Sequence, residues 1–208
     1  GDNVFKEFPE EMGGTWEDEW TIRGGHRFWT AHEGLHCYLP DNAPVDFREH
    51  CANGVEITSM RSDSYGFQKK LRVSIATDGR VDVEHELVNL GDQPLKLSPW
   101  ALSVMRAGGI AIIPQNPLGT HPTEQPPEAE ENPEDLLPDR NLVLWNYTSL
   151  SDARLELGSD LWRIHQTRDK PATKIGLFYR GGWVGYQLVG QVFSKSVPFE
   201  KRTPYPDG

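Results

Sequence analysis

Hydrophobic and polar residues alternate along much of the chain with a period of two. The clearest case is LRVSIATDGRVDVEHEL, residues 71–87, where every second position of both halves is apolar apart from one histidine. Alternation of this kind is typical of a β-strand with one apolar face. Asp78 and Gly79 lie between the two runs, and an Asp-Gly pair there is typical of a hairpin turn. We therefore expect an antiparallel hairpin.

The histidine in that hairpin, His85, shares a strand face with Val81, Val83 and Leu87. A lone histidine on an apolar face is more often a hydrogen-bonded core residue than a catalytic one. The pattern leaves two interpretations open, a core residue and a residue that lines a cleft.

Other alternating or apolar runs predict further short strands, at residues 95–105, 108–115, 141–148, 154–167 and 173–195. Helical patterns are scarce, and the 16 prolines and 20 glycines divide the chain into short pieces. Many short strands between frequent turns are typical of a β-sandwich or barrel. We predict an all-β fold, a large antiparallel sandwich, with residues 1–208 forming one domain.

Composition narrows the range of partners. Of the 208 residues, 37% are hydrophobic and 25% are charged, and the formal net charge is −10. Six acidic residues and no base lie between residues 124 and 135, so we expect an acidic, proline-rich, solvated loop at about 119–138. No basic patch suits nucleic acid or a membrane surface, and no apolar run is long enough to span a bilayer. We predict neither kind of partner.

The two cysteines, Cys37 and Cys51, are too few for a disulfide framework. One bridge or two free thiols are both compatible with the sequence. The compartment therefore stays open, with the cytoplasm slightly favoured. No secretory signal is visible, in a sequence whose natural start we expect to be missing.

The segment HEGLH, residues 32–36, matches the His-Glu-x-x-His spacing of zinc hydrolases. That chemistry needs a helix, which brings the two imidazoles to one face beside the carboxylate of Glu33. Gly34 and Pro40 oppose a helix there, and the preceding residues alternate like a strand. We predict no metal site, and a metal-dependent hydrolase that uses His32, Glu33 and His36 is the third of three functional alternatives.

A longer pattern runs through the same segment. It reads Gly-Gly-His-Arg-Phe-Trp over residues 24–29, then Glu33, then Pro-Asp-Asn at 40–42. It resembles a bacterial group of the galactose mutarotase-like (aldose 1-epimerase-like) superfamily. Later segments fit the same family in order, at 65–75, 85–105, 108–115, 136–152, 174–186 and 205–208. The resemblance implies an antiparallel β-supersandwich that acts on sugars.

Two departures from the family pattern matter. Related mutarotases carry a catalytic histidine on the strand after an Asn turn, and this chain has Trp100 near that position. The family's general base is a glutamate on a late strand, and this chain reaches TPYPDG at 203–208 without one. We expect the chain to be the middle of a longer domain, and to lack the first and last strands of that domain. Unpaired sheet edges would then favour self-association.

Opening a sugar hemiacetal needs an acid and a base, a task suited to histidine and carboxylate. Among the residues present, His26 is the first candidate for the acid or for a hydrogen bond to the sugar, and His85 is the second candidate for a catalytic residue. Six further residues are candidates for binding the sugar: Arg27, Trp29, Glu33, Gln115, Lys174 and Trp183.

Five of these six also have a structural interpretation. Arg27 could equally form an ion pair within the sheet, and Gln115 could cap a strand end. Lys174 could be a solvated lysine, and Trp29 and Trp183 could be core residues in a chain with seven tryptophans.

Three functions remain open. The first is an aldose 1-epimerase-like enzyme that interconverts sugar anomers by acid/base catalysis without a cofactor. The second is a non-catalytic carbohydrate-binding module on the same fold, which the Trp100 departure favours. The third is the metal-dependent hydrolase. All but the last imply a sugar ligand, and the sequence identifies neither the sugar nor the oligomeric state.

Overall fold

The computed structural model describes residues 2–11, 14–60, 66–121, 124, 140–168 and 170–200. Within these ranges the protein is all-β and its strands pair antiparallel, which confirms the predicted fold class at that level. The named helices there are two short 3-10 turns, η1 (Pro9–Glu11) and η2 (Leu35–Tyr38). No helix of the described residues is long and apolar enough to cross a bilayer.

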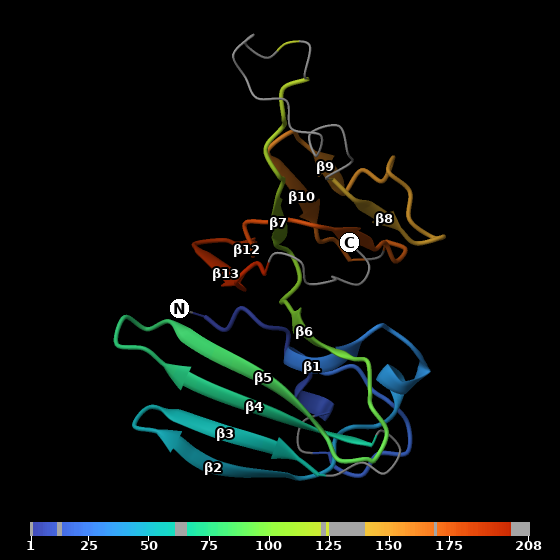
Figure 1. The fold of residues 1–208 in the computed structure, drawn as a ribbon. Helices are drawn as coiled ribbons and strands as arrows, with labels where there is room; N and C mark the ends of the chain where they lie inside the picture. Colours follow the sequence, from blue (N-terminus) through green and yellow to red (C-terminus); the bar gives the residue numbers. More distant parts are fainter. Residues whose placement is uncertain are drawn as a thin grey trace. The chain divides into compact units, whose positions relative to one another are not determined.

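The chain divides into two compact units, drawn in Figure 1 and described separately below. The N-terminal unit is Phe5–Met105, and the C-terminal unit is Arg106–Gly208 together with Gly1–Val4. A single domain over 1–208 stays a prediction. Of the acidic loop predicted at 119–138, residues 119–121 and 124 are described, and the remainder lies outside the described residues.

The N-terminal unit contains a four-stranded sheet in the order β2 (Val45–Cys51), β3 (Gly54–Ser59), β4 (Phe67–Ile75), β5 (Val81–Asn89). Figure 1 shows these strands as a meander in which chain neighbours lie side by side. The hairpin predicted over 71–87 is confirmed by β4 and β5. Leu71 pairs with His85 and Val73 with Val83, so the alternating positions share one face as expected.

The two faces of this sheet differ in character. On one face, the row across all four strands is Phe47, Ile57, Leu71, His85. On the other face, the neighbouring row is Arg48, Glu56, Arg72, Glu84, in which charge alternates. In these two rows the sheet therefore presents three apolar residues and a histidine on one side and charged residues on the other.

The second sheet of the N-terminal unit is a pair, β1 (Gly25–Ala31) with β6 (Ser98–Val104). Their hydrophobic residues form the core of this unit. Phe28 and Trp29 are buried, and the Trp29 ring packs edge-on against Trp100 with centroids 5.6 Å apart. Contact between β5 and β6 links the two sheets.

The C-terminal unit contains a five-stranded sheet in the order β13 (Gln191–Ser196), β12 (Trp183–Leu188), β7 (Ile110–Pro114), β10 (Leu161–His165), β9 (Leu155–Leu157). A separate pair joins β8 (Leu142–Leu144) and β11 (Ile175–Leu177). Tyr186 is buried, and its hydroxyl accepts the Gly109 N–H at 3.0 Å. This contact fixes the start of β7 against β12.

Candidate functional site

Two histidines far apart in sequence meet in the N-terminal unit. His26 lies on β1 and His85 on β5, and their Nε2 atoms are 2.7 Å apart. Both side chains are half-buried. Two ring nitrogens approach this closely only when one carries a proton and the other a lone pair. One imidazole therefore donates a hydrogen bond and the other accepts it. The two predicted catalytic residues therefore form one hydrogen-bonded pair.

Neighbouring strands hold the pair in place. His26 is opposite Ser103 on β6, and its Nδ1 lies 3.4 Å from the Ser103 hydroxyl oxygen. Phe28, two residues further along β1, therefore points to the same side and packs edge-on against the His85 ring, with centroids 5.0 Å apart. One hydroxyl, two imidazoles and one phenyl ring thus converge from three strands.

This arrangement can move protons. Histidine is the side chain whose ordinary titration falls nearest neutral pH, so a pair can offer one N–H donor and one lone pair at the same time. The Ser103 hydroxyl extends the chain of exchangeable protons by one group. His85 lies on the apolar sheet face and is hydrogen-bonded to His26, as the core interpretation predicts, while a role in lining a cleft stays a prediction.

Arg27 points to the other side of β1, where its side chain contacts other residues of the N-terminal unit. Its Nη2 donates to Asp41 at 2.9 Å, and Lys69 contacts the second oxygen of the same carboxylate at 3.2 Å. The guanidinium carbon lies 5.4 Å and 5.5 Å from the ring centroids of Trp20 and Trp29. Arg27 therefore forms an ion pair, as its structural alternative predicted, but with a loop residue outside the sheet, and Trp29 is a core residue that packs against it.

The HEGLH segment is not an α-helix. His32, Glu33 and Gly34 follow the end of β1, and a 3-10 turn starts only at Leu35. The Glu33 carboxylate accepts a hydrogen bond from Tyr38. His36 Nε2 lies 3.2 Å from the Thr30 hydroxyl.

The helix that a zinc hydrolase needs is thus missing from this segment, as its glycine and proline indicated. The described residues also contain no group of three or more His, Cys, Asp or Glu side chains placed to hold a metal ion. The geometry offers no support for the hydrolase alternative.

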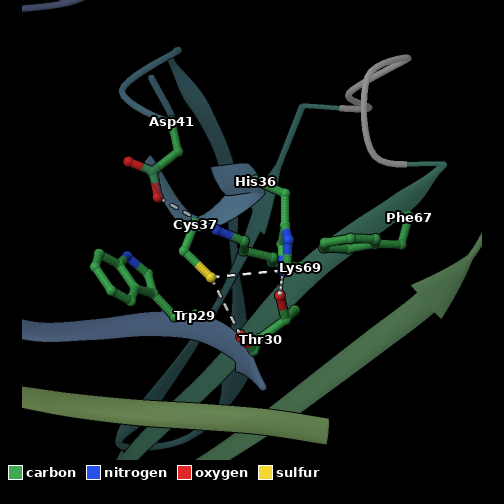
Figure 2. A pocket seen from close by; sticks show the side chains of 7 residues that line it. All are labelled: Trp29, Thr30, His36, Cys37, Asp41, Phe67 and Lys69. Atoms are coloured by element: carbon green, nitrogen blue, oxygen red, sulfur yellow. Dashed lines mark hydrogen bonds and ion pairs between the residues drawn. The ribbon is translucent and has the colours of Figure 1, made fainter. Parts of the chain in front are cut away.

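A small hollow lies beside this segment, and Figure 2 shows the side chains around it. It is lined by Trp29, Thr30, His36, Cys37, Asp41, Phe67 and Lys69. The space open to the centre of a water molecule is about 10 Å³, which suits one water and is far too small for a sugar ring. Cys37, one of these residues, is buried, and both cysteines are free thiols.

The remaining candidates lie in the C-terminal unit. The Gln115 side chain contacts the carbonyl oxygens of Ile113 and Pro114, which is the predicted strand-end role. The Lys174 ammonium lies 4.1 Å from the centroid of the Trp145 ring. Trp183 begins β12 and is 39% exposed, so of the two predicted aromatic candidates it is the one open to a ligand.

Sequence patterns missed two residues of the site. Ser103 and Phe28 attracted no prediction, since one is a small polar residue in a strand and the other a typical core aromatic. Alternation along β1 places Phe28 beside His26, but only the β1–β6 register brings Ser103 opposite, and a single sequence carries no signal for that pairing.

Comparison with known proteins adds no relative. No family model, no curated protein and no solved structure matches the chain. The resemblance to the galactose mutarotase-like superfamily therefore stays a prediction.

Proposed function

We propose that this protein is a sugar isomerase of the aldose 1-epimerase kind, with His26 and His85 as its acid/base pair. The observation that supports it is the 2.7 Å contact between their Nε2 atoms. The two residues lie 59 positions apart, and both are catalytic candidates from the sequence. The proposal includes the antiparallel supersandwich fold of that superfamily.

The chemistry is a balanced exchange of two protons. In this step His85 starts as a neutral ring, and its Nε2 takes the proton from the anomeric hydroxyl. His26 starts as an imidazolium, gives its Nε2 proton to the ring oxygen as the bond from that oxygen to the anomeric carbon breaks, and is left neutral with its other proton on Nδ1. The open aldehyde then rotates and closes on its other face, and both protons return. The rings are in contact without substrate, so a sugar must separate them or approach along their exposed edges.

Ser103 holds His26 in the required state. A hydroxyl beside Nδ1 can accept a hydrogen bond from a neutral ring and can stabilise a charged one. Phe28 against His85 limits access of water to that ring. These contacts let the pair exchange roles between the opening and closing steps without net uptake of protons.

The test measures conversion of pure α-galactose and α-glucose to the anomeric mixture by polarimetry, with the spontaneous rate subtracted. His26→Ala and His85→Ala should each lose at least about a hundredfold in rate, the usual contribution of a general acid or base. His50→Ala, an exposed histidine on β2 of the same unit, is the matched control and should keep full activity. No enhancement by the unmodified protein on any aldose would refute the proposal.

A second candidate, a carbohydrate-binding module without turnover, is favoured by Trp100 at the family's histidine position and by the exposed Trp183. It predicts saturable sugar binding by calorimetry with no polarimetric activity. Trp183→Ala should then lose affinity, whereas His26→Ala should not.

A further inference from the structure

The strand β2 leaves one edge of the four-stranded sheet open. Within the described residues it pairs with β3 on one side and with no strand on the other, and all seven of its residues are exposed. Phe47 is 78% exposed and Val45 is 50% exposed. A flat edge with large exposed apolar residues is a template for pairing with another strand.

The charged row of the sheet ends at this edge with a cation. Reading from β5, Glu84 contacts Arg72 at 2.7 Å, Arg72 contacts Glu56 at 2.7 Å, and Glu56 contacts Arg48 at 2.7 Å. Arg48 is 72% exposed, whereas Glu56 is 4% exposed between its two arginines. The alternation of signs thus stops with a positive residue on β2, and an acid beside it would continue the row.

We infer that a second copy of this chain supplies that acid, by antiparallel pairing of β2 with β2 about a two-fold axis at Phe47. A two-fold axis normal to the sheet keeps each face on its own side, so the face with the charged row in one copy continues into the same face of the other. With Phe47 opposite its own copy, Asp46 of one chain lies opposite Arg48 of the other, twice. Each charged row then reads Asp46, Arg48, Glu56, Arg72, Glu84 with strictly alternating sign.

The neighbouring registers are electrostatically worse. A centre at Asp46 opposes two aspartates, a centre at Arg48 opposes two arginines, and a centre at Glu49 opposes two glutamates, and like charges directly opposite destabilise a sheet. The ladder itself also favours Phe47. The β2–β3 register is regular from Val45 to Glu49 and shifts after Glu49, so the midpoint of the regular stretch is Phe47.

The apolar face gains from the same register. In each copy Phe47, Ile57 and Leu71 lie in one row across β2, β3 and β4. Pairing at Phe47 joins the two rows end to end and places the two phenyl rings side by side. Two four-stranded sheets become one eight-stranded sheet, and the exposed edge is removed from both.

Sedimentation velocity over a range of concentrations tests the dimer. The unmodified protein should shift from monomer to dimer as its concentration rises. Asp46→Arg should weaken that association about tenfold or more, because both Asp46–Arg48 pairs between the copies become repulsive. Asp92→Arg makes the same charge change at an exposed turn residue and should leave association unchanged. A monomer at every concentration would overturn the inference, as would equal effects of the two variants.

Thiol cross-linking tests the register. In a Cys51→Ser background, Phe47→Cys should form a disulfide-linked dimer under mild oxidation, because directly opposed positions lie close enough to bridge. Val45→Cys, on the same face of the same strand, is the control and should not cross-link, since its copy lies four residues away along the ladder. Cross-linking at Val45 but not at Phe47 would refute the register, and circular dichroism checks that both variants fold. Neither result depends on sugar isomerase activity.

Discussion

At the scale of single residues, Asp152 and Arg154 show how local hydrogen bonds change the pKa of a carboxyl group. Arg154 donates from its side chain to both Asp152 carboxylate oxygens, at 3.0 Å and 2.6 Å, and its backbone N–H donates at 2.9 Å. These bonds stabilise the charged carboxylate and lower the pKa of Asp152 from 3.8 to about 2. The stability that these hydrogen bonds contribute is therefore complete when the pH is above the pKa of the aspartate in the unfolded chain. It is lost as pH falls from about 4 to about 2.

The substitution Asp152→Asn should consequently lower the melting temperature at pH 7, and its deficit relative to the unmodified protein should shrink as pH falls to 2. Asp160→Asn changes an exposed carboxylate in the same unit and should show a much smaller effect. Thermal unfolding followed by circular dichroism at several pH values measures both. A deficit that stays constant across this pH range would contradict the role given to the ion pair.

Residue types alone indicated part of the candidate site. The His26 and His85 imidazoles were selected because few other side chains can exchange protons near neutral pH, and the structure brings them together. The same reasoning could not separate the two uses of Arg27, because a guanidinium suits a sugar hydroxyl and a carboxylate equally well. Only the position of Asp41 decides between them, and that position depends on a loop fold which no local pattern encodes.

At the scale of elements, the hairpin of β4 and β5 depends on the backbone of its turn. Gly79 has φ of +85°, a conformation that costs a residue with a side chain about 1–2 kcal/mol. No heavy atom lies within 4 Å of a side chain added there, so the cost is purely conformational. Gly79→Ala should lower the free energy of unfolding by about that amount, measured by urea denaturation.

Gly91→Ala is the matched control for the turn. Gly91 does not have a positive φ, and its nearest neighbour to an added methyl group is at an ordinary 3.6 Å. Its substitution should leave stability nearly unchanged. If both glycines tolerate alanine equally, the conformation assigned to Gly79 is wrong.

The elements predicted best are those that a short sequence window encodes. The hairpin at 71–87 combines alternation with a turn signal, so both its strands were predicted from the sequence and are confirmed, whereas its register was not predicted. The pairing of β1 with β6 joins residues more than 70 positions apart, such as His26 with Ser103. No local sequence pattern distinguishes that partner strand from the other apolar runs. The site that depends on the pairing can therefore be recognised only in the folded structure.

At the scale of the whole molecule, the two units have separate sheets and separate buried residues. Gly109 offers a way to perturb one of them, because an added methyl group would lie 2.5 Å from the Tyr186 ring. Gly109→Ala should therefore displace Tyr186 and break the hydrogen bond from the Gly109 N–H to its hydroxyl. Hydrogen exchange should accelerate in β7 and β12.

If the units are separate cooperative units, the amides of β4 and β5 should keep their protection in the Gly109→Ala protein, because none of the contacts that change belongs to the N-terminal unit. Gly119→Ala, where no atom lies within 4 Å of the added methyl group, controls for substitution within the C-terminal unit. An equal loss of protection in β4, β5, β7 and β12 would mean that the chain unfolds as one body. The histidine pair and the β2 edge would then share the stability of the C-terminal sheet instead of depending on their own.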